Sequence, residues 1–288
     1  MNVVRRPNYP ASTGDPAVLL QDSAFTLRNQ SCDILVDGDS TANVGIDPTV
    51  LAARTGLTAC NIATSRPIVD QLGTLPLDAF LQHNPPPKLI VLQYGPEVFY
   101  RAASGWQHNG PYVSFLMLTR NFPPQTALRT MLRHPAENTQ FVLYILQHQL
   151  LPNHPERQLP QFHRALDHAA VSNGQLDLNL PAQTACLAPP LPLYGPVDTA
   201  WIAQLRQKYQ ARGIAILIRA APIPACDPQL ARFQRDLTPV VDGPVEALPI
   251  SSFVAGDRHT TQPGSLLDTL GLVRLIQSRL IQSGLPNR

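Results

Sequence analysis

Three short apolar runs, each closed by polar or turn-forming residues, constrain the fold of this chain more than any other feature. They lie at 32–37, 57–62 and 88–94, and helix-forming sequence separates them. Short apolar runs bounded by turn residues indicate buried strands, and their alternation with helices indicates parallel pairing through right-handed crossovers. We therefore predict an α/β domain with a central, mostly parallel sheet.

Helix signals fill the intervals between these runs. Asp47 and Pro48 supply an N-cap and a first-turn proline for a helix that ends at Gly56. A longer helical stretch at 65–82 is weakened by Gly73 and Pro76. Further along the chain, we expect helices at 199–212, 228–237 and 263–283 and strands at 214–218 and 245–248.

Residues 99–196 interrupt the alternation. They contain amphipathic segments at 125–133, 138–151 and 160–171 and no convincing strand. Because the interval is too long for an ordinary loop, we predict a helical insertion that caps a substrate pocket. The alternative is a helical layer that covers one face of the sheet. In either case 1–288 forms a single domain, with 1–30 as an N-terminal extension.

The composition of the chain limits the kinds of partner that it is expected to bind. The chain has 22 Lys and Arg against 20 Asp and Glu, and no long basic run, which argues against a nucleic-acid binder. No apolar segment approaches the roughly 20 residues that span a bilayer, so we expect no membrane span. The N-terminus lacks the apolar core of a secretory signal, which predicts a cytoplasmic protein. A removed signal would instead place it in the periplasm.

The four cysteines show no spacing typical of a metal site. Cys32 and Cys60 fall at or inside expected strands, where cysteine commonly acts as a small apolar residue. We therefore expect four free thiols. Cys186 and Cys226, in proline-rich loops, are the pair to suspect if the protein is exported.

Polar residues at the two ends of the chain suggest a nucleophile and its base. Gly38, Asp39 and Ser40 follow the first expected strand, at the sheet edge where ligands bind in parallel folds. His259 precedes the last helix, and Asp257 lies two residues before it. A histidine that takes the serine proton makes the serine a nucleophile, and a carboxylate orients the histidine. We predict Ser40, His259 and Asp257 as catalytic residues; the competing interpretation is a capped polar turn and an exposed histidine.

These segments resemble the SGNH (GDSL-type) hydrolase superfamily. Gly38-Asp39-Ser40 matches its first sequence block, and Gly264, five residues after His259, matches the spacing of its last block. The resemblance covers the strand–helix plan outside the insertion and is specific only at its two ends. It implies a three-layer α/β/α, flavodoxin-like SGNH hydrolase fold with ester-hydrolysis or acyl-transfer chemistry, without a cofactor or metal.

The last block departs from the family pattern. The family usually has Asp-x-x-His, whereas Asp257 and His259 are one residue closer together. Asp257 either reaches the histidine by a different loop path or leaves Ser40 and His259 to act as a dyad. Nearby, Arg66 and Arg258 are either exposed arginines or ligands for a polar or anionic substrate group.

The groups that would stabilise an oxyanion also depart from the pattern. The family's third block contributes an asparagine after the third strand, but this chain continues with Gly95, Pro96 and Glu97, which we place near the pocket. The second block contributes a glycine amide after the second strand. In this chain that amide would come from Ala63, Thr64 or Ser65, with the amides near Gly38, Asp39 and Ser40 completing the site.

The resemblance implies a serine esterase or acyltransferase that acts on O-acyl esters, chiefly acetyl, of a carbohydrate or polysaccharide. Divergent family members of this kind act on bacterial cell-surface polymers, so polysaccharide-synthesis machinery is an expected partner. One alternative is a non-catalytic polysaccharide-binding or scaffold protein on the same fold. The other is a lipase or thioesterase whose helical insertion forms an apolar lid, with 115–118 lining it.

Overall fold

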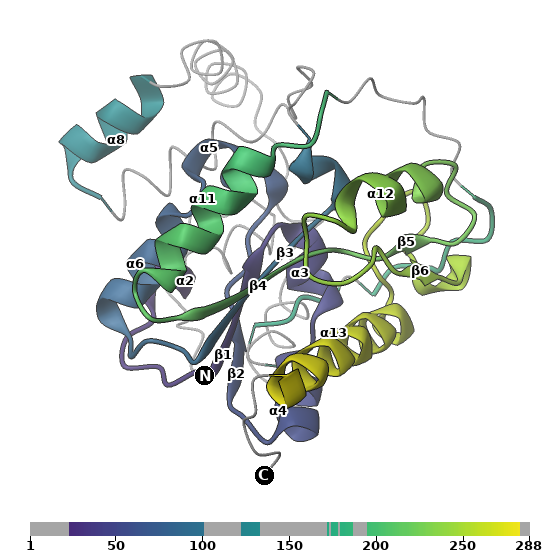
Figure 1. The fold of residues 1–288 in the computed structure, drawn as a ribbon, viewed down its shortest axis with the longest axis horizontal. Coiled ribbons are helices and arrows are strands. Elements are labelled where there is room, and N and C mark those ends of the chain that lie inside the picture. Colours follow the sequence, from purple (N-terminus) through teal and green to yellow (C-terminus); the bar gives the residue numbers. More distant parts are fainter. Residues whose placement is uncertain are drawn as a thin grey trace, which may run out of the picture.

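The computed structural model describes residues 23–100, 122–132, 172, 174–177, 179–186 and 195–282. At its centre is a four-stranded parallel sheet in the order β2-β1-β3-β4 (Figure 1). The strands are β1 (Ile34–Gly38), β2 (Ala59–Asn61), β3 (Leu89–Tyr94) and β4 (Ala215–Ala220). The predicted α/β class and the parallel pairing are therefore confirmed, with strand bounds that differ from the predicted ones by a few residues.

The central strands of this sheet are buried on both sides, because helices cover both of its faces. On one face, Leu35 and Ile90 belong to a core that includes residues of α6 (Leu75–His83), α11 (Thr199–Gln210) and α12 (Leu230–Leu237). On the other face, Val36 and Val91 pack with α3 (Ser40–Gly45), α4 (Pro48–Thr55) and α13 (Gln262–Gln282). Figure 1 shows α11 and α13 on opposite sides of the strands. The arrangement has three layers.

Local signals set several helix ends. The Asp47 side chain caps α4 by accepting a hydrogen bond from the Thr49 amide at 2.7 Å, and Gly56 ends the helix with a φ of 70°. The helical stretch expected at 65–82 is two helices, α5 (Arg66–Leu72) and α6, because Gly73 breaks it with a φ of 54°. Within the described residues, no helix combines the length and apolarity needed to cross a bilayer.

Part of the interval at 99–196 is described. α8 (Pro124–Leu132) corresponds to the helix expected at 125–133, and its Ala127 packs in a small cluster with Ile68 of α5. The short 3-10 helix η2 (Pro96–Phe99) ends where this interval begins, and a second one, η4 (Ile250–Ser252), lies after the interval. The helices expected at 138–151 and 160–171 and the apolar run 115–118 lie outside the described residues. Of the extension at 1–30, only α2 (Ser23–Thr26) and the residues after it are described.

The later part of that interval returns to the central domain. The Leu176 amide donates to the Asn43 carbonyl of α3 at 3.0 Å, and the Gln183 amide donates to the Phe253 carbonyl at 2.7 Å. Gly174 lies so close to the β2 backbone that a Cβ there would overlap the Asn61 carbonyl. These residues therefore pack against the segments that carry the predicted site.

The strand expected near 245–248 does not join the central sheet. It is β6 (Ala247–Leu248), which pairs in parallel with β5 (Ile223–Pro224) in a separate two-stranded sheet. The Ile223 amide donates to the Glu246 carbonyl at 3.1 Å, and the Ala225 amide donates to the Leu248 carbonyl at 2.8 Å.

The prediction of four free thiols is wrong. Cys32 is bonded to Cys60, and Cys186 is bonded to Cys226. The first bond joins the residues before β1 to β2 inside the core, and the second joins two exposed loops. The apolar surroundings of Cys32 suit a buried thiol and a buried disulfide equally, so the sequence did not separate the two cases.

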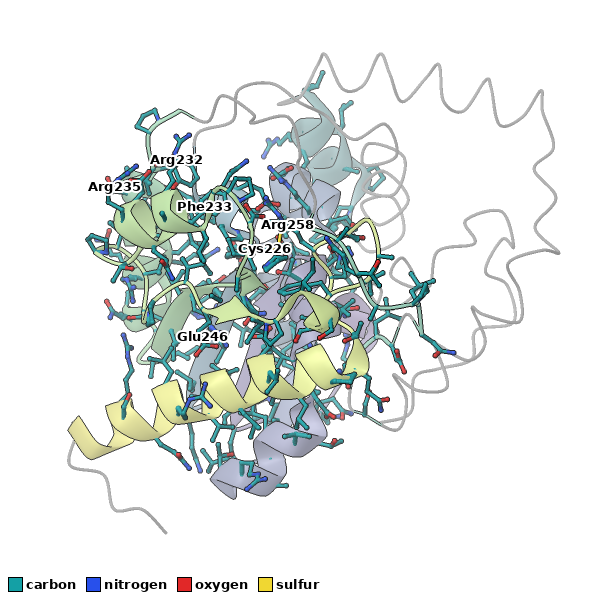
Figure 2. The ribbon with its side chains drawn as sticks, turned by 90° about the vertical axis from the view of Figure 1, so that its right-hand side faces the viewer. Cys226, Arg232, Phe233, Arg235, Glu246 and Arg258 are labelled. Carbon is teal, nitrogen blue, oxygen red and sulfur yellow. A yellow bond between two sulfur atoms is a disulfide. The ribbon has the colours of Figure 1, made fainter. Side chains whose placement is uncertain are left out.

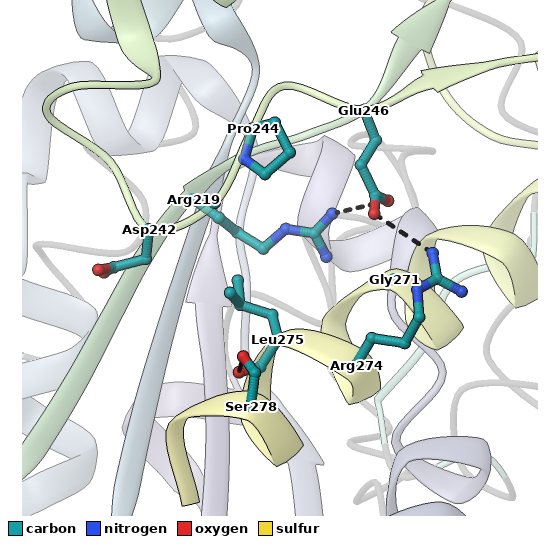
Figure 3. A pocket seen from close by; sticks show the side chains of 9 residues that line it. Arg219, Asp242, Pro244, Glu246, Gly271, Arg274, Leu275 and Ser278 are labelled. Atoms are coloured by element: carbon teal, nitrogen blue, oxygen red, sulfur yellow. Dashed lines mark hydrogen bonds and ion pairs between the residues drawn. The ribbon is translucent and has the colours of Figure 1, made fainter. Parts of the chain in front are cut away.

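A buried charge network fixes α13 on the sheet. Arg219 of β4 is 3% exposed and lies 3.0 Å from Asp268 of α13 and 3.5 Å from Glu246. Figure 3 shows Glu246 between Arg219 and Arg274, beside a cavity of about 220 Å³. A Cβ on Gly271 would overlap the Glu246 carboxylate, so the glycine allows this close approach. The helix that follows His259 is thereby held in place.

Gly38, at the end of β1, occupies a position that has no room for a side chain. Its φ is 150°, and an added Cβ would overlap the carbonyl oxygen of Gln93 in β3. We expect Gly38→Ala to lower the free energy of unfolding by more than about 3 kcal/mol, because backbone strain and a steric overlap add. Gly56→Ala is the matched control: its φ is also positive, at 70°, but no atom lies within 4 Å of the added Cβ. Urea unfolding that gave equal losses for the two variants would contradict this account.

Asp37 of β1 is a buried carboxyl group on the face covered by α11. It is 6% exposed, and burial, followed by the nearby Asp78 charge, raises its pKa to about 7. A raised pKa means that the folded state binds more protons than the unfolded state, so its contribution to stability falls as pH rises from about 4 to about 7.

We therefore expect Asp37→Asn to raise the free energy of unfolding at pH 8 by at least about 1 kcal/mol and to change it little at pH 4. Asp33→Asn serves as a control of opposite sign, because the pKa of Asp33 is lowered, chiefly by its hydrogen bond with Lys88. Urea titrations at the two pH values distinguish the cases; an Asp37→Asn variant that is less stable at pH 8 would refute the assignment.

Candidate active site

Ser40 lies at the carboxyl end of β1 as the first residue of α3. Asp39 caps this helix: its Oδ1 accepts hydrogen bonds from the Thr41 amide at 2.9 Å and from the Thr41 hydroxyl at 2.5 Å. The other oxygen of Asp39 accepts a hydrogen bond from the Gly95 amide at 2.9 Å. Asp39 is almost fully buried, whereas Ser40 is partly exposed. The turn is therefore rigid, and its serine is accessible.

Two buried asparagines hold this turn against the segment that follows β2. Asn43 of α3 donates to the Ala63 carbonyl at 3.1 Å. Asn61 of β2 donates to the Ala42 carbonyl at 2.9 Å and to the Ile46 carbonyl at 3.1 Å. Both side chains are 2% exposed. These bonds fix the serine turn relative to the second loop of the site.

His259 and Asp257 form a direct contact. The Nδ1 atom of His259 lies 2.5 Å from Oδ2 of Asp257. Backbone bonds close the loop between them: the Asp257 amide donates to the Val254 carbonyl at 3.1 Å, and the Val254 amide donates to the His259 carbonyl at 2.8 Å. The short Asp-x-His spacing therefore permits the contact, and it leaves Nε2 as the ring nitrogen that can face a serine.

The charges around His259 favour its protonated form. Burial lowers the pKa of His259, but the Asp257 hydrogen bond and charge, with smaller contributions from Asp39 and Glu97, raise it above its ordinary value. Burial raises the pKa of Asp257, but the hydrogen bond and charge of His259, together with backbone hydrogen bonds, outweigh it, and the pKa lies below the usual range. The histidine is thus suited to accept and stabilise a proton.

Ser40 and His259 belong to the same neighbourhood but are not hydrogen-bonded. Asp39, the residue before Ser40, acts electrostatically on His259. In the part of the chain that the structure describes, neither the Ser40 hydroxyl nor His259 Nε2 has a hydrogen-bond partner. Catalytic hydrogen bonds often tighten only when substrate binds, so a serine–histidine pair does not require this bond in the free protein.

The three candidate amides after β2 differ in their availability. The Ala63 amide donates to the Asn61 side chain at 3.0 Å, and the Thr64 amide donates to the Gly38 carbonyl at 2.9 Å. The Ser65 amide has no hydrogen bond within the described residues. Of the three, Ser65 is therefore the amide left to meet a ligand, together with the amide of Ser40.

Glu97, which lies in η2 after β3, joins two arginines. Its Oε1 lies 3.2 Å from Nη1 of Arg66, and its Oε2 lies 3.3 Å from Nη1 of Arg258. Arg258 also contacts Asp227 at 2.9 Å, and its guanidinium lies 5.8 Å from the ring centre of Phe233 (Figure 2). The side chain of Arg258 is 19% exposed, which contradicts its interpretation as an exposed arginine. These pairings were not predictable, because the partners lie far apart in the sequence.

Within the described residues, no group of three or more His, Cys, Asp or Glu side chains has the arrangement of a metal site. No family model, no curated protein and no solved structure matches this chain. The fold and the placement of Ser40, His259, Asp257 and Glu97 are therefore the features from which a function can be inferred.

Proposed function

We propose that the protein is a serine esterase or O-acyltransferase in which Ser40 is the nucleophile, His259 the general base and Asp257 the group that orients the histidine. The contact of 2.5 Å between Asp257 and His259 is the observation that carries this proposal. An exposed loop histidine would not need a carboxylate at this distance. The location of Ser40 at the carboxyl end of a parallel strand is the second support.

The proposed reaction has two halves. His259 Nε2 takes the Ser40 hydroxyl proton while Ser40 Oγ bonds to the acyl carbon of the ester, and the amides of Ser40 and Ser65 stabilise the oxyanion. The intermediate then collapses: the bond from the acyl carbon to the alcohol oxygen breaks, and His259 protonates that oxygen. Water or a sugar hydroxyl resolves the acyl-enzyme by the same steps in reverse.

The charged groups of the candidate site contact one another. Burial, followed by the charge of Glu97, raises the pKa of Asp39 above its ordinary value. Glu97 contacts Arg66 and Arg258, and Asp257 contacts His259, so the charges at the site offset one another and do not call for a charged substituent on the substrate. We therefore propose an O-acetyl group on an uncharged sugar as the substrate class.

The two disulfides support an oxidising compartment, such as the periplasm or the cell exterior, as the place of action. This replaces the cytoplasmic location expected from the N-terminal sequence. Such a location also agrees with a role in modifying cell-surface polysaccharides and with synthesis machinery as a partner.

A comparison of acyl-chain length tests the function. We expect release of acetate from acetylated sugars or a small acetyl ester to exceed release of octanoate from the matched octanoyl ester, with Ser40→Ala inactive on both. A preference for octanoate would favour a lipase or thioesterase. Lack of turnover on acetylated mono- and oligosaccharides, with and without an acceptor sugar, would refute the proposal.

A further inference from the structure

Glu97 lies where three segments of the candidate site meet. Arg66 is the first residue of α5, which follows β2; Glu97 lies in η2, which follows β3; and Arg258 lies in the loop before α13. Each carboxylate oxygen of Glu97 contacts a different arginine, Oε1 to Arg66 at 3.2 Å and Oε2 to Arg258 at 3.3 Å. Only 18% of the Glu97 side chain is exposed, so solvent screens these pairs less than surface pairs.

Arg258 links Glu97 to the His259 loop, because Arg258 and His259 are adjacent in the sequence. Its guanidinium lies between Glu97 and Asp227, 2.9 Å from the latter, and beside the Phe233 ring (Figure 2). Asp257 orients the imidazole from within the same loop, but it cannot place that loop relative to the sheet. The contacts of Arg258 with Glu97 and Asp227 connect this loop to the rest of the domain.

Gly95 connects Glu97 to the serine turn. The Gly95 amide donates to Asp39, the residue before Ser40, at 2.9 Å. The Glu97 carboxylate folds over the same glycine, since a Cβ on Gly95 would lie 3.1 Å from Oε1. The glycine therefore leaves room for the carboxylate beside the turn that carries the nucleophile.

We propose that Glu97 is a positioning residue that, through Arg258 and Gly95, fixes the His259 loop relative to the Ser40 turn. This inference rests on the proposed function and gives the residue at the missing asparagine position a role other than oxyanion donation. The charged groups that act on His259 are Asp257, Asp39 and Glu97, and Glu97 contributes to its raised pKa. Loss of the Glu97 charge therefore disfavours the imidazolium form.

Phosphonylation of Ser40 by a small fluorophosphonate, measured as a rate against pH, tests the inference without knowledge of the natural ester. For Glu97→Gln we expect the plateau rate to fall about 10- to 100-fold, because small misplacements of reacting groups have effects of this size. We also expect the acid limb of the profile to move to lower pH. A residue needed only for folding would not move that limb. Thermal unfolding verifies that the variant is folded.

Two further variants separate position from charge. Gly95→Ala keeps the Glu97 charge but displaces its carboxylate, so we expect a slower rate with a smaller change in the acid limb. Asp70→Asn removes a carboxylate 3.6 Å from Arg66 that has no contact with Arg258, and we expect its rate to stay within about twofold of wild type. Equal rates and equal profiles for wild type and Glu97→Gln would overturn the inference.

The pKa of His259, measured by NMR in wild type and in Glu97→Gln, gives a readout that does not depend on catalysis. If the wild-type serine does not react at all, the proposed function fails. In that case a lower His259 pKa in Glu97→Gln would still support the placement of Glu97 beside the histidine loop, and an unchanged pKa would overturn it.

Discussion

Replacement of Ser40 or His259 by alanine is expected to lower ester turnover by at least about 10⁴-fold. Each variant removes one half of a unit: without His259 the serine keeps its proton, and without Ser40 the histidine has no nucleophile to activate. The effects should therefore not add, and the double variant should be no slower than either single variant. Initial rates on a small acetyl ester check this expectation.

Asp257→Asn provides the graded comparison. It retains a side chain of the same shape but removes the charge that raises the His259 pKa, so turnover should fall while the acid limb of the pH–rate profile moves to lower pH. Independent, multiplying losses for Ser40→Ala and His259→Ala would contradict the claim that the two residues act together.

The second large effect is expected on stability, from Arg219. In Arg219→Met, the carboxylates of Asp268 and Glu246 lose the guanidinium that neutralises them. Asp268 is 1% exposed, so an unpaired charge remains in the core. Breaking one side of a buried ion pair commonly costs about 3–5 kcal/mol, and we expect a loss of this size in the free energy of unfolding measured in urea at pH 8.

Arg274→Met is the matched control, because Arg274 pairs with the same Glu246 but is 68% exposed. Surface pairs contribute about 0–1 kcal/mol, so its effect should be several-fold smaller. The Arg219→Met loss should also shrink at pH 5, since burial raises the pKa of Asp268 to about 6 and the carboxyl group can protonate. Similar losses for the two variants, or a loss independent of pH, would count against the network.

Short-range signals explain which parts of the fold could be predicted from the sequence. The apolar runs that form β1, β3 and β4 can be recognised from local sequence, because a buried parallel strand needs a continuous apolar segment. Asp47 and Gly56 set the ends of α4 through contacts within a few residues. These features require no knowledge of distant partners.

Features that depend on distant partners could not be predicted. The start of α3 at Ser40 has no apolar periodicity, and its placement depends on bonds from Asn61 and on the Gly95 amide. Glu97 meets Arg258 across 161 positions of the chain. The cysteines likewise pair across 28 and 40 positions, and no local pattern distinguishes such a bond from two buried thiols.

The candidate site illustrates both cases. The Asp257-Arg258-His259 spacing suggested a doubtful triad, yet the loop closes through the Val254 backbone and brings the two side chains within 2.5 Å. For the oxyanion, the sequence offered three amides after β2, and only the hydrogen bonds of the folded chain distinguish Ser65 from the other two.

The most direct test of Ser40 as an activated nucleophile is the intact mass of the protein after treatment with a small fluorophosphonate, for wild type and Ser40→Ala. We expect a single phosphonyl adduct on the wild type, located at Ser40, and no adduct on the folded Ser40→Ala variant. An unmodified, folded wild type, or an adduct that persists in Ser40→Ala, would contradict the assignment of Ser40 as an activated nucleophile.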